Sequence, residues 1–95
     1  MNGAAPTILV ADDHPLFREA LKGAVARQLP KARLVEADSA DALFAIADAH
    51  PDADLLLLDL NLPDASGTSV LESLATRAPD LKILVLSGVQ DQRSV

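Results

Sequence analysis

Residues 55–59, Leu-Leu-Leu-Leu-Asp, give the strongest indication of the fold of this chain. The four leucines are apolar at every position rather than at alternate positions, which is typical of a strand buried on both faces of a parallel sheet. Asp59 closes this strand with a carboxylate. The stretch therefore predicts a sheet that is covered on both faces, with an acidic group at the carboxyl end of one strand.

Similar aliphatic strands alternate with amphipathic segments on both sides of this stretch. In the amphipathic segments, apolar residues recur at spacings of three and four, and each segment ends before a proline. The resulting order, βαβαβαβ, predicts the α/β class with a parallel sheet. The predicted strands are residues 8–11, 34–37, 55–58 and 81–86, and the predicted helices are residues 15–29, 39–50 and 70–78.

The composition excludes several classes of protein. A chain of 95 residues, 49% hydrophobic and 23% charged, suits one small domain. Its formal net charge of −6 repels a phosphate backbone, so we expect no DNA binding by this chain itself. The chain has no cysteine and no apolar run of membrane-spanning length. We therefore expect a cytoplasmic protein without membrane contact, and a flexible lead-in at residues 1–6.

Polar side chains follow three of the predicted strands. Asp12 and Asp13 come after the first strand, Asp59 after the third and Ser87 after the fourth. Ligands of open parallel sheets bind beyond the carboxyl ends of the strands, so these groups are predicted to converge. Neighbouring carboxylates there repel each other by about 3 kcal/mol per pair at an effective dielectric of about 20. Either a retained proton or a hard divalent cation must relieve the repulsion, and we favour Mg²⁺.

Other polar and aromatic residues are expected to have structural roles. A lone acid after a strand is often a helix cap, but three acids at two strand ends favour a functional cluster. His14 is predicted to be a surface residue in a loop, and His50 an exposed helix end. Phe17 and Phe44 are predicted to be core residues.

Several chemistries of phosphate and acyl groups do not fit. Residues 11–15 contain no glycine and no Lys-Ser or Lys-Thr pair follows them, which disfavours both a dinucleotide-binding turn and a Walker loop. Ser87 is not in a Gly-x-Ser-x-Gly elbow, which disfavours a serine hydrolase. An aspartate that accepts a phosphoryl group, with Mg²⁺ to screen the charge, fits better.

Three motifs within residues 7–88 stand out together. They are Val-Ala-Asp-Asp-His-Pro at 10–15, Leu-Leu-Asp-Leu-Asn-Leu-Pro-Asp-Ala-Ser-Gly at 57–67 and Leu-Ser-Gly at 86–88. Together they resemble the motifs of the bacterial response regulator receiver domain. The resemblance implies a flavodoxin-like, doubly wound parallel sheet of strand order 2-1-3-4. It also implies a phosphoacceptor in two-component signal transduction rather than an enzyme, with a sensor histidine kinase as the donor.

The resemblance also implies roles for single residues. Asp59 is then the phosphoacceptor. Asp13 and Asp59 ligate Mg²⁺ directly, Asp12 orients the ion or its water, and the backbone carbonyl of Asn61 is a further ligand. Ser87 resembles the switch hydroxyl that turns inward to bond a phosphoryl oxygen.

The chain departs from the receiver pattern at its C-terminal end. Receiver domains have five βα units, and the fifth, with its lysine and aromatic switch residue, is missing here. The His-Pro pair and the first helix resemble the subfamily whose output is a helix-turn-helix domain that binds DNA and regulates transcription, and this output is also absent. Residues 1–95 are therefore interpreted as a truncated receiver domain, with residues 89–95 either disordered or the start of a fourth helix.

This interpretation predicts an incomplete core and leaves two alternative functions open. Half of one sheet face would be bare, so aliphatic side chains of the third and fourth strands are expected to meet water. We expect a homodimer, formed across the fourth strand or by exchange of the C-terminal segment. The alternatives are an aspartyl-nucleophile Mg²⁺ phosphatase like the haloacid dehalogenases, and an interaction module that is not phosphorylated.

Overall fold

The computed structural model describes residues 5–86 of the chain. The predictions for residues 1–4 and 89–95 lie outside this range. Within it, strands and helices alternate in the predicted order, and all seven predicted elements are present. They are β1 (Thr7–Ala11), α1 (Pro15–Gln28), β2 (Arg33–Ala37), α2 (Ala40–Ala49), β3 (Leu55–Leu58), α3 (Gly67–Arg77) and β4 (Lys82–Val85).

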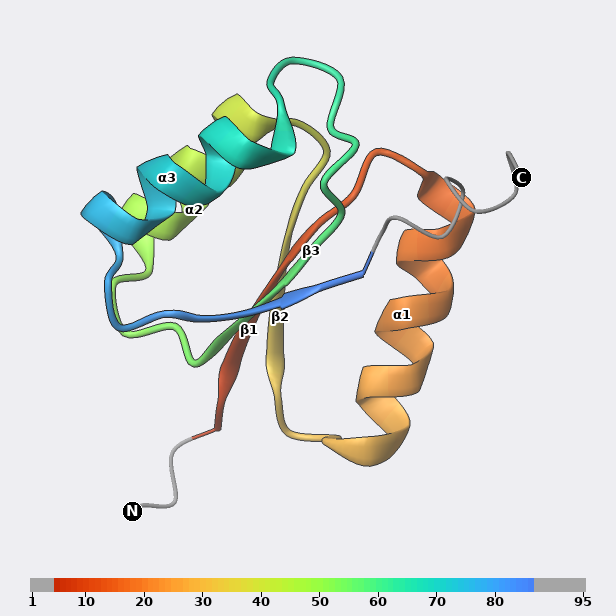
Figure 1. Cartoon of the computed structure of the whole chain (residues 1–95). Helices are drawn as coiled ribbons and strands as arrows, with labels where there is room; N and C mark the ends of the chain where they lie inside the picture. The colour runs from red at the N-terminus through yellow and green to blue at the C-terminus, as the bar shows by residue number, and fades with distance from the viewer. Residues whose placement is uncertain (1–4, 87–95) are drawn as a thin grey trace.

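The strands form one parallel sheet in the order β2-β1-β3-β4, which confirms the predicted fold class and strand order. α1 lies on one side of the sheet, and α2 and α3 lie together on the other (Figure 1). In the register of the central pair, Ala11 is opposite Leu58. The residues that follow β1 and β3 therefore lie next to each other at the carboxyl edge.

Local sequence signals explain where the helices begin and end. The hydroxyl of Ser39 accepts a hydrogen bond from the N–H of Ala42 and so caps the start of α2. Ser66 caps α3 in the same way through the N–H of Ser69. Because of this second cap, α3 begins at Gly67, earlier than the apolar pattern from Val70 indicated. The helices end before prolines, as predicted.

The sheet separates two apolar clusters of unequal size. On the side of α1, the buried members among residues 5–86 are Ile8, Val10 and Leu57, with Leu21 and Val25 of α1 partly buried against them. The cluster on the side of α2 and α3 is larger and extends through both helices to the sheet. Its buried members are Leu9, Ala11, Ala37, Ala40, Leu43, Ala47, Leu56, Leu58, Leu62, Val70 and Leu74.

Three predictions about single residues need correction. Phe17 is 45% exposed in the first turns of α1, so its assignment to the core is wrong. Phe44 is only partly buried, at the margin of the larger cluster, where the guanidinium of Arg77 lies 4.7 Å from the centre of its ring. His50 ends α2 as its C-cap, as expected, but is partly buried rather than exposed. Aromatic residues in amphipathic helices thus lie at the edge of the apolar stripe here rather than at its centre.

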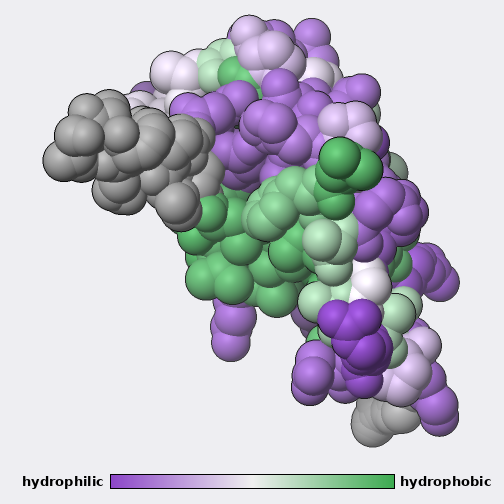
Figure 2. All heavy atoms as spheres, turned by 90° about the vertical axis from the view of Figure 1, so that its right-hand side faces the viewer, coloured by the Kyte–Doolittle hydropathy of each residue, from purple (hydrophilic) through white to green (hydrophobic). Residues whose placement is uncertain are grey.

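The fourth strand carries the exposed apolar surface of the sheet. Leu84 is 53% exposed and Val85 is 40% exposed, on opposite faces of β4. The expected exposure of the third strand is wrong, because Leu56, Leu57 and Leu58 are buried by neighbours on both sides. Figure 2 shows an apolar area on the side of the molecule that carries α1. The bare region is therefore narrower than predicted and is concentrated on the edge strand.

Two glycines in helices give opposite expectations for substitution by alanine. A Cβ on Gly67 would lie 2.7 Å from Cβ of Leu60, so Gly67→Ala should destabilise the fold by about 1–3 kcal/mol through overpacking. A Cβ on Gly23, inside α1, would only meet Arg27 Nη1 at 3.6 Å. Gly23→Ala should therefore stabilise by up to about 1 kcal/mol through helix propensity. Urea unfolding of both variants measures the change in the free energy of unfolding relative to wild type. A Gly67→Ala variant that is more stable than wild type would contradict the tight contact with Leu60.

Candidate functional site

The acidic residues predicted to converge lie together at the carboxyl edge of the sheet. The ladder continues beyond the strands, since the N–H of Asp59 donates to the carbonyl of Ala11 at 2.9 Å. The N–H of Asp12 likewise donates to the carbonyl of Ala37 at 3.0 Å. These bonds place Asp12 and Asp59 side by side, with relative exposures of 0% and 4%. Asp13 is partly buried next to them.

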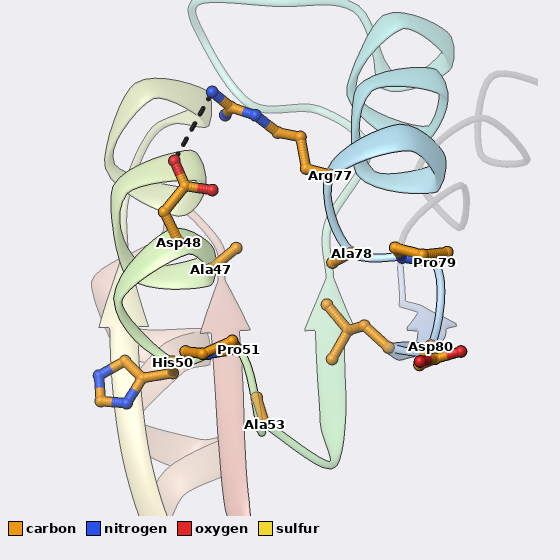
Figure 3. Close-up of a pocket in the computed structure, with 10 residues that line it drawn as sticks. Ala47, Asp48, His50, Pro51, Ala53, Arg77, Ala78, Pro79 and Asp80 are labelled. Atoms are coloured by element: carbon orange, nitrogen blue, oxygen red, sulfur yellow. Dashed lines mark ion pairs between the residues drawn. The ribbon is translucent and has the colours of Figure 1, made fainter.

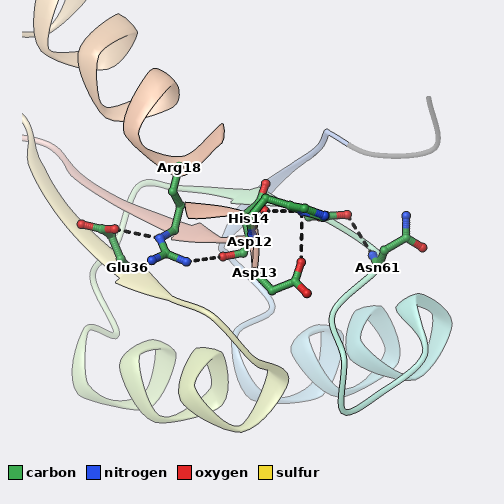
Figure 4. Close-up of polar contacts among 7 residues, drawn as sticks. Asp12, Asp13, His14, Arg18, Glu36 and Asn61 are labelled. Atoms are coloured by element: carbon green, nitrogen blue, oxygen red, sulfur yellow. Dashed lines mark hydrogen bonds and ion pairs between the residues drawn. The ribbon is translucent and has the colours of Figure 1, made fainter. Parts of the chain in front are cut away.

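His14 lies among these carboxylates, a position that the surface assignment missed (Figure 4). Its Nδ1 is 3.0 Å from Oδ1 of Asp12, 3.1 Å from Oδ1 of Asp13 and 3.5 Å from Oδ2 of Asp59. The hydrogen bond to Asp12, and then the charge of Asp13, raise the pKa of His14 above its ordinary value. The ring is still 62% exposed, so it closes the cluster from the solvent side.

The cluster has the donor set and the spacing of a metal site. One ligand atom each from Asp12, Asp13, His14 and Asp59 can be chosen within 4.8 Å of one another. Oδ2 of Asp12 and Oδ1 of Asp13 are buried, and neither accepts a hydrogen bond among the described residues, although the His14 ring lies 3.1 Å from the Asp13 oxygen. Buried carboxylate oxygens without donors need a cation or a proton. The residues present therefore fit a divalent cation that prefers oxygen ligands.

Arg18 positions the end of β1 through a contact that the sequence did not reveal. Its Nη1 donates to the backbone carbonyl of Asp12 at 2.7 Å, and its Nε donates to Oε1 of Glu36 at 3.0 Å (Figure 4). Nζ of Lys22 lies 2.9 Å from Oε2 of Glu36. Lys22, and then Arg18, lower the pKa of Glu36. The two cations thus join α1 to β2 beside the acidic cluster.

The loop after β3 holds Asp59 and also caps α2. The N–H of Asn61 donates to Oδ1 of Asp59 at 2.9 Å. The carboxylate of Asp64 accepts from the N–H groups of Ala40 and Asp41 at 2.6 and 3.0 Å, across 24 and 23 residues of sequence. Sequence analysis missed this cap because nothing near Ala40 indicates a distant acceptor. The loop that carries Asn61 is thereby fixed to the first turn of α2.

Two predicted site groups are not placed by the structure. Ser87, the predicted switch hydroxyl, lies outside the described residues. The backbone carbonyl of Asn61 stays a predicted ligand, because only the N–H of that residue has a described contact at the cluster.

A cavity of about 230 Å³ opens at the opposite edge of the sheet, between the C-terminal ends of α2 and α3 (Figure 3). Nη2 of Arg77 lies 3.7 Å from Oδ2 of Asp48 at this cavity. His50 also lines it, whereas Asp12, Asp13 and Asp59 do not. The cavity is therefore separate from the acidic cluster.

Comparison with protein families gives one match that covers most of the chain. The family model of the response regulator receiver domain matches residues 8–95. No helix among the described residues is long and apolar enough to cross a membrane.

Curated relatives of the chain include regulators of transcription. The chain is 39% identical over 88 residues to the glycerol metabolism activator of Pseudomonas putida, covering 93% of this chain and 40% of that protein. It is 36% identical to the transcriptional regulatory protein DegU of Brevibacillus brevis, covering 93% of this chain and 37% of that protein. The chain thus spans about 40% of the length of these relatives.

Solved structures show the same fold. The response regulator TrrA from Thermotoga maritima, solved in complex with Mg²⁺-BeF, aligns with a TM-score of 0.79 at 28% identity, over 94% of this chain and 75% of that one. The signal receiver domain of the response regulator NarL from Mycobacterium tuberculosis aligns with a TM-score of 0.74 at 30% identity, over 85% of this chain and 64% of that one.

The cap made by Asp64 gives a stability that depends on pH. The N–H groups of Ala40, first, and of Asp41 lower the pKa of Asp64. A carboxyl whose pKa is lowered by folding stabilises the fold above its unfolded pKa of about 3.9, and this stabilisation is lost as the pH falls through the folded value. Asp64→Asn should therefore lower the urea midpoint at neutral pH, and the difference from wild type should shrink in acid.

Asp52→Asn is the control for this measurement, because Asp52 lies exposed in the loop before β3 and its substitution removes the same charge. If Asp64→Asn loses the same stability relative to wild type at a pH of about 7 and at about 3, the hydrogen bonds do not favour the ionised carboxylate.

Proposed function

Because the chain belongs to the response regulator receiver family, we propose that it accepts a phosphoryl group on Asp59 from a sensor histidine kinase and so switches a transcriptional output. The observation that carries this proposal is the position of Asp59. Its side chain is 6% exposed, it directly follows the central strand β3, and it lies among the other acids. Oδ1 accepts from Asn61, and Oδ2 faces the cluster at His14.

The transfer we propose is a displacement at phosphorus. An oxygen of the Asp59 carboxylate forms the new P–O bond while the P–N bond of the donor phosphohistidine breaks, and the leaving imidazole takes up a proton. The N–H of Asn61 orients the carboxylate through Oδ1. The small exposure of Asp59 keeps the resulting acyl phosphate away from bulk water, which favours a phosphoryl group that persists.

Mg²⁺ is the proposed cofactor, held by Asp13, Asp59 and the carbonyl of Asn61, with Asp12 orienting the ion or its water. When bound, it supplies positive charge that offsets the repulsion between the acids and the incoming phosphoryl oxygens. The buried oxygen of Asp12 without a partner, the partly buried Asp13 and the hard donor set support this assignment.

The remaining roles follow from family membership. We assign Ser87 as the switch hydroxyl that forms a hydrogen bond with the phosphoryl group. We also assign the chain to the cytoplasm, where it meets the kinase domain. DegU is named as a transcriptional regulatory protein, and both named relatives are longer than this chain, so any contact with DNA is proposed for parts of the protein beyond it. The domain takes up one phosphoryl group per chain rather than turning over a substrate, which distinguishes it from a phosphatase.

Phosphoryl uptake tests the role of Asp59. With Mg²⁺ and a small phosphoryl donor, we expect the wild-type chain to gain one alkali-labile phosphoryl group by intact-mass measurement. Asp59→Asn should gain none, and Asp13→Asn should gain at least about tenfold less, because the metal site is weakened.

Asp38→Asn is the matched control, because it removes an exposed acid after β2 and should leave the labelling unchanged. Equal labelling of wild type and Asp59→Asn would remove Asp59 from its role. Steady release of inorganic phosphate without a labelled chain would favour the phosphatase, and no uptake at all would contradict the proposal for this chain.

We also propose that the chain forms a homodimer through β4, directly or by exchange of its C-terminal segment. In support, β4 is the edge strand of the described sheet and exposes Leu84 and Val85. An edge with free backbone groups and apolar side chains is a template for pairing with another chain.

Light scattering coupled to size exclusion tests the dimer. Wild type should elute as a dimer at micromolar concentration. Leu84→Ser should raise the dissociation constant of the dimer at least about tenfold. Leu16→Ser makes the same chemical change at a side chain that is 86% exposed in α1 rather than in β4, and should leave the dimer intact. A wild-type monomer with a cooperative melt would contradict the proposal.

A further inference from the structure

His14 adds a nitrogen donor to a cluster whose other donors are oxygens. The chain has two histidines, and only His14 lies at the carboxyl edge of the sheet. Its own N–H donates to Oδ1 of Asp12 at 2.7 Å, which holds the residue over the acids. The position of the ring is therefore tied to the backbone, although much of the ring is exposed.

The separations around Nδ1 are those of ligands that share one ion. Neighbouring ligands of an octahedral ion with bonds of about 2.1 Å lie about 3.0 Å apart, and opposite ligands about 4.2 Å apart. Nδ1 lies 3.0, 3.1 and 3.5 Å from oxygens of Asp12, Asp13 and Asp59. All four donor atoms lie within 4.8 Å of one another, close to the span of the ligands of one ion.

A second observation points to a cation in the same place. The side chain of Asp12 is 1% exposed, and its Oδ2 is buried without a hydrogen-bond partner among the described residues. His14 satisfies only Oδ1 of that carboxylate. The cluster thus retains unsatisfied negative charge even with the imidazole in contact.

We propose that His14 is a direct metal ligand through Nδ1, so that the site selects first-row transition cations such as Ni²⁺ and Zn²⁺ over Mg²⁺. This inference rests on the proposed function only in that the acidic cluster holds a divalent cation. Imidazole is a good ligand for Ni²⁺ and Zn²⁺, whereas Mg²⁺ prefers oxygen. The ring coordinates in its neutral form, with the remaining proton on Nε2.

Titration calorimetry at one fixed pH, on the full 95-residue chain without a histidine tag, tests this proposal. Affinities for Mg²⁺ and Ni²⁺ are measured for wild type, His14→Ala and the control His50→Ala. We expect His14→Ala to weaken Ni²⁺ binding by at least about tenfold and Mg²⁺ binding by far less. His50→Ala should change neither, since His50 lies at the opposite edge of the sheet.

A spectroscopic measurement identifies the nitrogen directly. In wild type labelled with ¹⁵N, diamagnetic Zn²⁺ should shift the Nδ1 signal of His14 while Nε2 keeps its proton, and the signals of His50 should stay in place.

Two kinds of result would overturn the ligand role of His14 or the metal site itself. An unchanged ratio of Ni²⁺ to Mg²⁺ affinity in His14→Ala, or tighter binding of both ions, would overturn the ligand role and show that the ring only balances charge. A wild-type chain that binds neither ion would overturn the metal site itself. Because the uptake of phosphoryl by Asp59 is measured separately, the failure of this inference is distinguishable from the failure of the proposed function.

Discussion

Repulsion between buried carboxylates is the constraint on which the carboxyl edge of this sheet depends. The register that sets Ala11 opposite Leu58 forces Asp12 and Asp59 together, because each directly follows its strand. Both side chains are almost completely buried and poorly hydrated, so keeping their carboxylates charged costs free energy. Proteins accept such local costs at functional sites and offset them elsewhere. The apolar cluster beneath the acids is the part of this molecule that offsets them.

Polar contacts around the cluster fix the acids in place without neutralising them. Arg18 binds the carbonyl of Asp12 rather than its carboxylate, and Asn61 offers a backbone N–H to Asp59. Among the described residues, His14 is the group with a positive form that touches the acids themselves. The fixed groups of the protein therefore orient the acids, and most of their negative charge is left for a reversibly bound cation to balance.

The periodicity of the sequence and the residues at the strand ends predicted the topology and the clustering of the acids. The contacts made by individual polar side chains could not be predicted in this way. The run Leu55–Leu58, the spacing of apolar residues in the helices and the prolines after them led to the correct topology, and the topology brought the acids together. The contacts of Arg18, His14 and Asp64 were missed because each is chosen by tertiary geometry rather than by neighbours in the chain. Phe17 was misplaced for a related reason, since an apolar residue near a helix start is exposed when no element packs over it.

The attachment of α1 has a consequence for the dynamics of the domain. No residue of this helix is fully buried, and its firmest contacts with the sheet include ionic ones, from Arg18 and Lys22 to Glu36. Ionic contacts at a surface are screened by salt, whereas the packing of α2 and α3 is not. Local unfolding should therefore begin at α1, as a separate low-energy opening that precedes global unfolding. Because His14 occupies the N-cap position of this helix, opening of the helix would release the histidine from the acids while Asp59 stays anchored in the core.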